Sequence, residues 1–204
     1  MGIRTISLAV TFTVAMFAAP LAAQMDTEGL PPEAPRVGTI ITIDVSTNQA
    51  YLFRDGELVR KSAAATGSNK ILRKGQRVWW FRTPRGRHAV VRKVVDPVWT
   101  KPDWAFIEEG KAVPPPDSPK RKERGTMGKY ALDLGDRIMI HGTNDPKSIG
   151  RRVSHGCIRL PKDMLALLWK EAEVGTEVYI YDSQPQFASS EGLNDLEMTD
   201  VEGR

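Results

Sequence analysis

The chain has 204 residues and a formal net charge of +4, and 41% of its residues are hydrophobic and 26% are charged. These values suit one soluble globular domain with its own core, and say little about function. The sequence contains a single cysteine, which excludes a disulfide bond within the chain.

The N-terminus has the pattern of a secretory signal peptide in residues 1–23. A basic start, "MGIR", precedes a largely apolar run, and "PLAAQ" supplies small residues before acidic sequence begins. We expect export and cleavage after Ala23. An uncleaved membrane anchor is the alternative, and it would be the chain's only contact with a membrane. Residues 24–37 are rich in proline and acidic groups, and are expected to form a flexible spacer.

Short alternating runs of apolar and polar residues follow and predict a series of strands. We expect them near 39–45, 48–53, 57–65 and 87–95, and in the segments "YALDL", "RIMIHG" and "TEVYIYD". Asp55-Gly56 is a good hairpin turn pair, and 83–86 is a second turn. The pattern predicts one mainly β domain over residues 38–182.

One helix is expected in "PKDMLALLWKEAEVG", residues 161–175. Pro161 suits a first helical turn, apolar residues recur at helical spacing, and Gly175 suits the end. From Ser183 onward the chain carries five Asp/Glu against one arginine. We therefore expect an acidic, disordered tail at 183–204.

Residues 96–126 are rich in proline and poor in strand-forming residues, which predicts a long loop. Such a loop inside a compact domain is usually functional or disordered. Trp99 and Trp104 favour a role in substrate binding. The alternative is a local plug that packs on the core.

Residues 70–93 contain nine Lys/Arg and no Asp/Glu, with Trp79, Trp80 and Phe81 among them. A segment of this kind can bind nucleic acid. An exported protein instead meets anionic lipid headgroups and cell-wall carboxylates, so we expect no nucleic-acid partner. A solvated basic face is the simplest interpretation, and Trp79 and Trp80 either contact glycan or only pack.

The single cysteine, Cys157, lies in "RVSHGCIRL", residues 152–160. A free thiol in an exported chain is either buried and inert or a nucleophile that a nearby histidine activates. His155 lies two residues before it, and His141 ends a predicted strand, where a rigid scaffold can aim a side chain at a site. We expect His88 to be structural or exposed.

Two other chemistries fit these residues less well. A closed zinc site needs four ligands, and "HGC" lacks the spacing of paired zinc ligands. Ser154 is a conceivable nucleophile, but the sequence has no G-x-S-x-G elbow. Cys157 is the better nucleophile, and no metal is expected.

The segment "IHGTNDPKSIGRRVSHGCIRL", residues 140–160, resembles the signature of L,D-transpeptidases with the YkuD-type catalytic domain, of the periplasmic ErfK/YbiS-like group. "TPRGRH", "DPVWTKPDW" and "GTMGKYALDL" resemble the stretches that precede this signature. The resemblance implies a β-sandwich with one or two short helices and a long proline-rich loop over the active site. It also implies a periplasmic location, no cofactor, and inhibition by carbapenems.

By this resemblance, Cys157 is the nucleophile, His141 is its general base and acid, and the backbone carbonyl of Gly142 orients His141. Arg159 matches a position associated with the substrate or with holding the motif loop. The residues that support the oxyanion position and the motif are Ser154, His155 and Gly156. Gly156 has a local reason as well, since glycine lets the backbone N–H groups turn towards an oxyanion.

The implied reaction has two acyl transfers. Cys157 attacks the peptide bond after diaminopimelate in a peptidoglycan stem tetrapeptide and releases D-alanine, and an amine then attacks the thioester. The amine belongs either to a second diaminopimelate or to a lysine of an envelope protein, such as an outer-membrane lipoprotein or β-barrel protein. A hydrolase on the same scaffold and a catalytically silent wall-binding protein are the alternatives.

Overall fold

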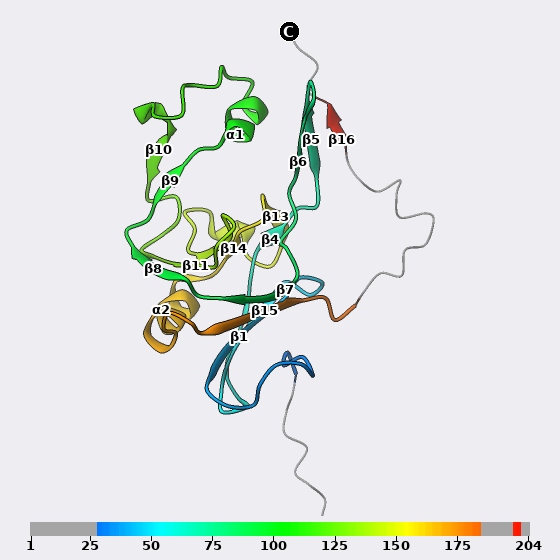
Figure 1. Cartoon of the computed structure of the whole chain (residues 1–204), viewed down its shortest axis with the longest axis vertical. Helices are drawn as coiled ribbons and strands as arrows, with labels where there is room; N and C mark the ends of the chain where they lie inside the picture. Colours follow the sequence, from blue (N-terminus) through cyan, green and yellow to red (C-terminus); the bar gives the residue numbers. More distant parts are fainter. Residues whose placement is uncertain (1–27, 185–197, 201–204) are drawn as a thin grey trace, which may run out of the picture.

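The computed structural model describes residues 28–184 and 198–200, so the expected signal peptide lies outside the described residues (Figure 1). Two sheets share the main apolar core. The five-stranded sheet has the order β3 (Glu57–Ala63), β2 (Gln49–Arg54), β1 (Thr39–Asp44), β15 (Glu177–Tyr181), β7 (Gly86–Ala89). The four-stranded sheet has the order β14 (Ile158–Arg159), β12 (Met139–His141), β11 (Tyr130–Asp133), β8 (Arg92–Val95). The prediction of a mainly β sandwich is confirmed.

The first sheet is covered on both faces. Alternation along β1 places Ile41 and Ile43 in the main core, whereas Ile40 joins a second cluster on the opposite face. Leu30 and Ala34 are buried in that second cluster. Residues 28–37 were expected to belong to a flexible spacer, and this part of the segment is packed instead, because the second apolar face of the sheet needs cover.

The expected helix is α2 (Lys162–Glu171), which packs Met164 and Leu168 into the main core. It ends before Gly175, because Ala172 takes an extended backbone conformation and the Gly175 N–H donates to the carbonyl of Val90. In the described part of the chain, no helix is long and apolar enough to cross a bilayer.

The single strand expected at 87–95 is two strands in different sheets, β7 and β8, so this prediction is wrong. The N–H of Val90 donates to the Thr176 carbonyl beside β15, and the N–H of Val91 donates to the Asp133 carbonyl of β11. The chain therefore changes sheets between these two valines. The alternating pattern continues through the change, which is why it suggested one strand.

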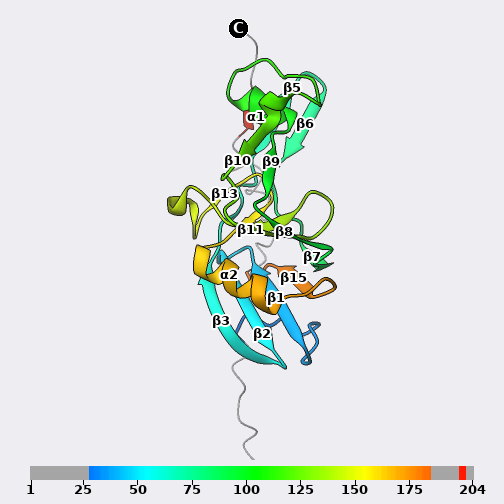
Figure 2. The same cartoon turned by 90° about the vertical axis from the view of Figure 1, so that its left-hand side faces the viewer.

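Two segments project from the same end of the sandwich (Figures 1 and 2). One is a hairpin of β5 (Ile71–Lys74) and β6 (Arg77–Trp80). The other, within the proline-rich stretch, contains β9 (Val98–Thr100), α1 (Asp103–Glu108), a 3₁₀ turn at Pro119–Arg121 and β10 (Lys122–Arg124). An apolar cluster that includes Leu72, Phe81 and Ile107, with Trp79 and Trp104 against it, joins the two segments.

The stretch expected to be a long loop is thus an ordered insertion, and Arg121 holds it together. The guanidinium of Arg121 is buried and donates to the carbonyls of Lys101, Pro114 and Pro115, and it pairs with Asp103 at 2.7 Å. Backbone carbonyls that proline leaves without strand partners are satisfied in this way.

Near the motif, β4 (Thr66–Gly67) pairs with β13 (Arg152–Ser154), and a 3₁₀ turn lies at Pro146–Ser148. Part of the tail expected to be disordered forms a strand, β16 (Met198–Asp200), which pairs in parallel with β5. The edge of β5 that β6 does not cover offers backbone groups with which β16 pairs. Residues 185–197 lie outside the described part.

Candidate active site

An open cleft of about 1620 Å³ lies against the second sheet and both projecting segments. It collects side chains that are far apart in the sequence. The candidate residues that line it are Cys157, His141, Ser154, His155, Arg159, Trp99 and Trp104.

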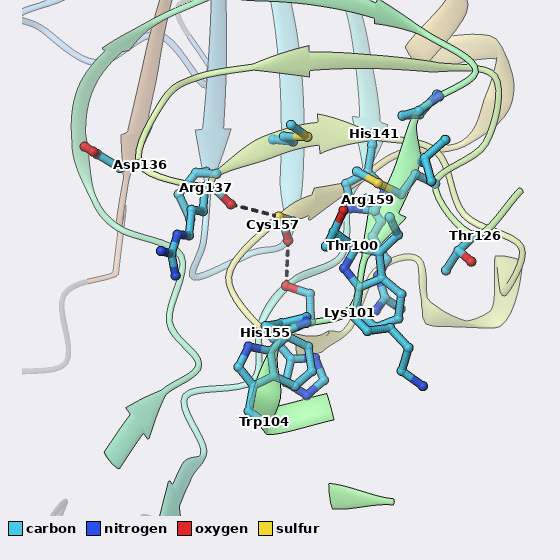
Figure 3. A pocket seen from close by; sticks show the side chains of 18 of the residues that line it. Thr100, Lys101, Trp104, Thr126, Asp136, Arg137, His141, His155, Cys157 and Arg159 are labelled. Carbon is cyan, nitrogen blue, oxygen red and sulfur yellow. Dashed lines mark hydrogen bonds between the residues drawn. The ribbon is translucent and has the colours of Figure 1, made fainter. Parts of the chain in front are cut away.

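Strand pairing explains how His141 and Cys157 come to line the same cleft. His141 is the last residue of β12, and β12 pairs in parallel with β14, which places His141 opposite Arg159. Cys157 immediately precedes β14. Figure 3 shows His141 and Arg159 to the same side of Cys157, with Arg137 on the other side.

The hydrogen bond of His141 defines its tautomer. Its Nδ1 lies 2.5 Å from the carbonyl oxygen of Gly142. Because a carbonyl only accepts, Nδ1 carries the proton and Nε2 keeps its lone pair. Burial lowers the pKa of His141 to about 4, while the bond to Gly142 acts in the opposite direction and the charge of Arg159 assists burial. At neutral pH the imidazole is therefore an uncharged proton acceptor.

The thiol of Cys157 is partly exposed in the cleft, and its Sγ–H donates to the carbonyl of Arg137 at 3.5 Å. The protein groups around the sulfur displace water that would solvate a thiolate, and this desolvation raises the pKa of Cys157, whereas the Met139 N–H and the charge of Arg159 act in the opposite direction. Since the imidazole is also neutral, the resting pair is thiol and imidazole rather than thiolate and imidazolium.

The backbone before Cys157 is shaped by Gly156, whose φ is +129°. A Cβ at this position would lie 3.1 Å from the carbonyl oxygen of Arg82. Ser154 closes the turn, since its hydroxyl donates to the Cys157 carbonyl at 2.5 Å and accepts from the Gly156 N–H at 3.1 Å. Glycine is needed here for both its conformation and its lack of a side chain.

Thr83 also holds this turn, and sequence reasoning missed it. Its hydroxyl donates to the Gly156 carbonyl at 2.8 Å and accepts from the Gly67 N–H at 2.8 Å. The only signal was its place in "TPRGRH", which predicted a turn rather than a contact with the motif loop.

His155 is engaged away from the thiol. Its ring stacks on Trp104 at 3.8 Å between centroids (Figure 3). It also meets Phe81 edge-on at 4.3 Å, and its Nε2 lies 2.8 Å from Glu108 Oε2. The side chain thus ties the motif loop to α1. It has a partner at Nε2 already, which favours a supporting role over that of the base for Cys157. Glu108 carried no sequence signal.

The tryptophans divide into packed and exposed ones. Trp104 was expected either to bind substrate or to pack locally, and its position allows both. It lines the cleft and packs between His155 and Trp99, whose ring centroid lies 6.0 Å from its own. Trp79 packs against the cluster beneath α1. Trp80 is 51% exposed, with the Arg82 guanidinium over its ring at 4.2 Å.

Two remaining expectations concern His88 and metals. His88 lines the cleft within β7, and its Nε2 is buried with no hydrogen-bond partner in the described residues. Within the same described residues, no group of three or more His, Cys, Asp or Glu side chains is placed to hold a metal ion.

Comparisons with known proteins agree with this geometry. The model of the YkuD family, the L,D-transpeptidase catalytic domain, matches residues 38–180. A Salmonella typhimurium protein described as a probable L,D-transpeptidase, ErfK/SrfK, is 34% identical over 168 residues, which cover 77% of this chain and 48% of that protein. An Escherichia coli protein described as a probable L,D-transpeptidase, YbiS, is 38% identical over 110 residues, which cover 50% of this chain and 33% of that protein. The chain therefore spans about half or less of the length of these relatives.

Solved structures show the same fold. The L,D-transpeptidase of Xylanimonas cellulosilytica superposes with a TM-score of 0.54 at 21% identity, covering 74% of this chain and 64% of that one. The L,D-transpeptidase of Mycobacterium smegmatis gives 0.51 at 25% identity, with 70% and 58% covered. The family match extends over most of the sequence and includes both Cys157 and His141, and the chain belongs to the YkuD family of L,D-transpeptidase catalytic domains.

Proposed function

We propose that this protein is a peptidoglycan L,D-transpeptidase, with Cys157 as nucleophile and His141 as general base and acid. The observation that carries the proposal is the bond from His141 Nδ1 to the Gly142 carbonyl, which leaves Nε2 unprotonated in the cleft that His141 shares with Cys157. Membership of the family and the names of the relatives support the same activity.

The first half of the reaction forms a thioester. Because thiol and imidazole are both neutral at rest, the Sγ proton passes to His141 Nε2 as the sulfur attacks the carbonyl carbon of the peptide bond between diaminopimelate and D-alanine. The C–N bond then breaks, and D-alanine leaves with the proton that His141 returns to its nitrogen. Arg159 stabilises the thiolate that develops, since its charge favours the ionised form of Cys157.

Charge on the attacked carbonyl oxygen needs donors. The Gly156 N–H already donates to Ser154. We therefore assign the oxyanion contact of this turn to the Cys157 N–H. The preceding residues Ser154, His155 and Gly156 fix the backbone conformation that orients it. Trp99 and Trp104 form one wall of the substrate cleft, and Arg159 binds the donor stem or holds the loop.

The second half transfers the acyl group to an amine. His141 takes a proton from the attacking nitrogen and returns it to the departing sulfur of Cys157. Diaminopimelate of a second stem gives a cross-link, and a lysine of an outer-membrane lipoprotein or β-barrel protein gives an anchored protein. Both acceptors place the enzyme in the periplasm, consistent with the apolar N-terminal segment.

The test is incubation of the purified protein with monomeric muropeptides that carry tetrapeptide stems, followed by mass spectrometry. We expect dimers and free D-alanine, and neither from Cys157→Ala. Cleaved monomers without dimers would show that the enzyme hydrolyses the stem and does not transfer it. No product from the wild-type protein would overturn the proposal. A carbapenem added to the intact protein should increase its mass by one adduct, and should leave Cys157→Ala unchanged.

A further inference from the structure

The cations that line the cleft fall into two groups. The paired group has carboxylate partners: Arg77 and Arg121 with Asp103, Arg92 with Asp133, Lys93 with Glu173, and Lys101 with Glu109. The other group has no ion pair in the described part of the chain, and consists of Arg82, Arg137 and Arg159. Each of the three lies by the turn that carries Cys157. Arg159 follows the cysteine by two residues, the Arg137 carbonyl accepts from its Sγ, and the Arg82 carbonyl approaches Gly156.

The unpaired arginines lie on two sides of the thiol. Arg159 lies on the side of His141, and Arg137 lies on the opposite side of Cys157 (Figure 3). The backbone of Arg137 is fixed beside the thiol, because its carbonyl accepts from Cys157 Sγ at 3.5 Å and its φ is +65°. This conformation belongs to the tight turn between β11 and β12, where Asp136 also has a positive φ, so the turn fixes where the Arg137 side chain leaves the backbone.

Arg82 is fixed to the same turn from the other direction. Its carbonyl approaches Gly156 so closely that a Cβ there would lie 3.1 Å away, and the next residue, Thr83, bonds the Gly156 carbonyl. The ring of Trp80 supports its guanidinium at 4.2 Å, which limits the freedom of the side chain. The backbones of Arg82 and Arg137 are therefore both fixed against Gly156 and Cys157.

We propose that Arg82 and Arg137 form a carboxylate-binding subsite on the side of Cys157 opposite to Arg159. No carboxylate of the cleft lining pairs with either arginine. Asp103 pairs with Arg77 and Arg121, and Asp136 forms no ion pair in the described residues. Guanidinium groups bind carboxylates through paired N–H donors. This inference rests on the proposed function, and it names the donor as a stem peptide with carboxylates on both sides of the attacked carbonyl.

Binding to an acylation-dead protein separates this inference from the proposed activity. In the Cys157→Ala background, calorimetry measures the Kd of the stem tetrapeptide and of forms in which one carboxylate at a time is an amide. We expect Arg137→Gln and Arg82→Gln each to weaken binding of the tetrapeptide on the order of ten-fold. Arg137→Lys should retain part of the affinity, and Arg73→Gln on the outer face of β5 should change nothing.

The decisive result is coupling between arginine and carboxylate. One of the singly amidated peptides should bind weakly to the Cys157→Ala protein, and adding Arg137→Gln should not weaken its binding further. The peptides amidated at another carboxylate should still lose about ten-fold in affinity on Arg137→Gln. Equal losses for every peptide, or no loss for any, would overturn the subsite. If wild-type protein forms no thioester in intact-mass measurements, the proposed function fails, and the binding experiment still decides the subsite by itself.

Discussion

Thr83 donates its hydroxyl proton to the carbonyl oxygen of Gly156 at 2.8 Å, and so ties the turn before β7 to the residue that precedes the nucleophile. The same oxygen atom accepts from the N–H of Gly67 next to β13. Both hydrogen bonds are buried. One hydroxyl thus joins three segments that are distant in the sequence at the point where Cys157 must be held.

Replacing this hydroxyl by a methyl group tests its role. Thr83→Val keeps the shape of the side chain and leaves a buried donor and a buried acceptor without partners, which costs about 1–3 kcal/mol each. We expect the free energy of unfolding to fall by about 2–6 kcal/mol in urea titrations, and thioester formation at Cys157 to slow. Thr83→Ser keeps both bonds and should stay close to wild type; equal damage from both variants would point to packing of the methyl group instead.

Gly156→Ala should separate backbone strain from collision. The alanine would have to adopt a φ of +129° with its Cβ 3.1 Å from the Arg82 carbonyl oxygen. We expect a loss of about 2–3 kcal/mol in unfolding free energy, together with slower alkylation of Cys157 by iodoacetamide. Gly135→Ala is the matched control, because its φ is +83° and no atom lies within 4 Å of its Cβ. A smaller loss is expected there, and equal losses would argue against the collision.

Local signals explain what the sequence analysis could predict. Alternation identified β1 and β2, proline and an apolar stripe identified α2, and a contiguous motif made Cys157 and Gly142 candidates for the site. Each of these depends on residues that are neighbours in the chain. The hydrogen bond of His141 to the next residue is of the same kind, which is why its expected partner is found in the structure.

Long-range partners explain what it could not predict. Thr83 and Glu108 act on the motif loop across 73 and 47 positions of sequence, and neither residue type nor spacing indicates such a contact. The β5–β6 hairpin was missed because charged residues interrupt its apolar pattern. The proline-rich stretch is ordered by the buried Arg121. Its acceptors include the carbonyl of Lys101, twenty residues earlier, and the sequence does not indicate that these groups come together.

Trp104 and Trp80 should respond differently to truncation, although both line the cleft. Trp104 stacks on His155, and its ring centroid lies 5.3 Å from that of Phe81. Trp104→Leu therefore removes the aromatic contacts that support His155, two residues before Cys157. We expect a loss of about 2 kcal/mol in stability and slower acylation of Cys157. Trp80 is 51% exposed, and Trp80→Leu should unfold within about 0.5 kcal/mol of wild type. Chemical denaturation of the two variants side by side measures the contrast, and similar losses would contradict it.

The burial of His141 predicts how stability depends on pH. Its pKa falls from 6.5 to about 4 in the folded protein, so between these values the unfolded chain binds more protons than the folded one. Stability from this residue is therefore complete above about pH 6.5 and is lost as the pH falls towards 4, by up to about 3 kcal/mol. His141→Gln should flatten the curve of unfolding free energy against pH in this window, whereas Cys157→Ala, which keeps the imidazole, should preserve it. Parallel curves for wild type and His141→Gln would show that the imidazole is not buried in its neutral form, and would remove the uncharged resting pair on which the proposed proton transfer depends.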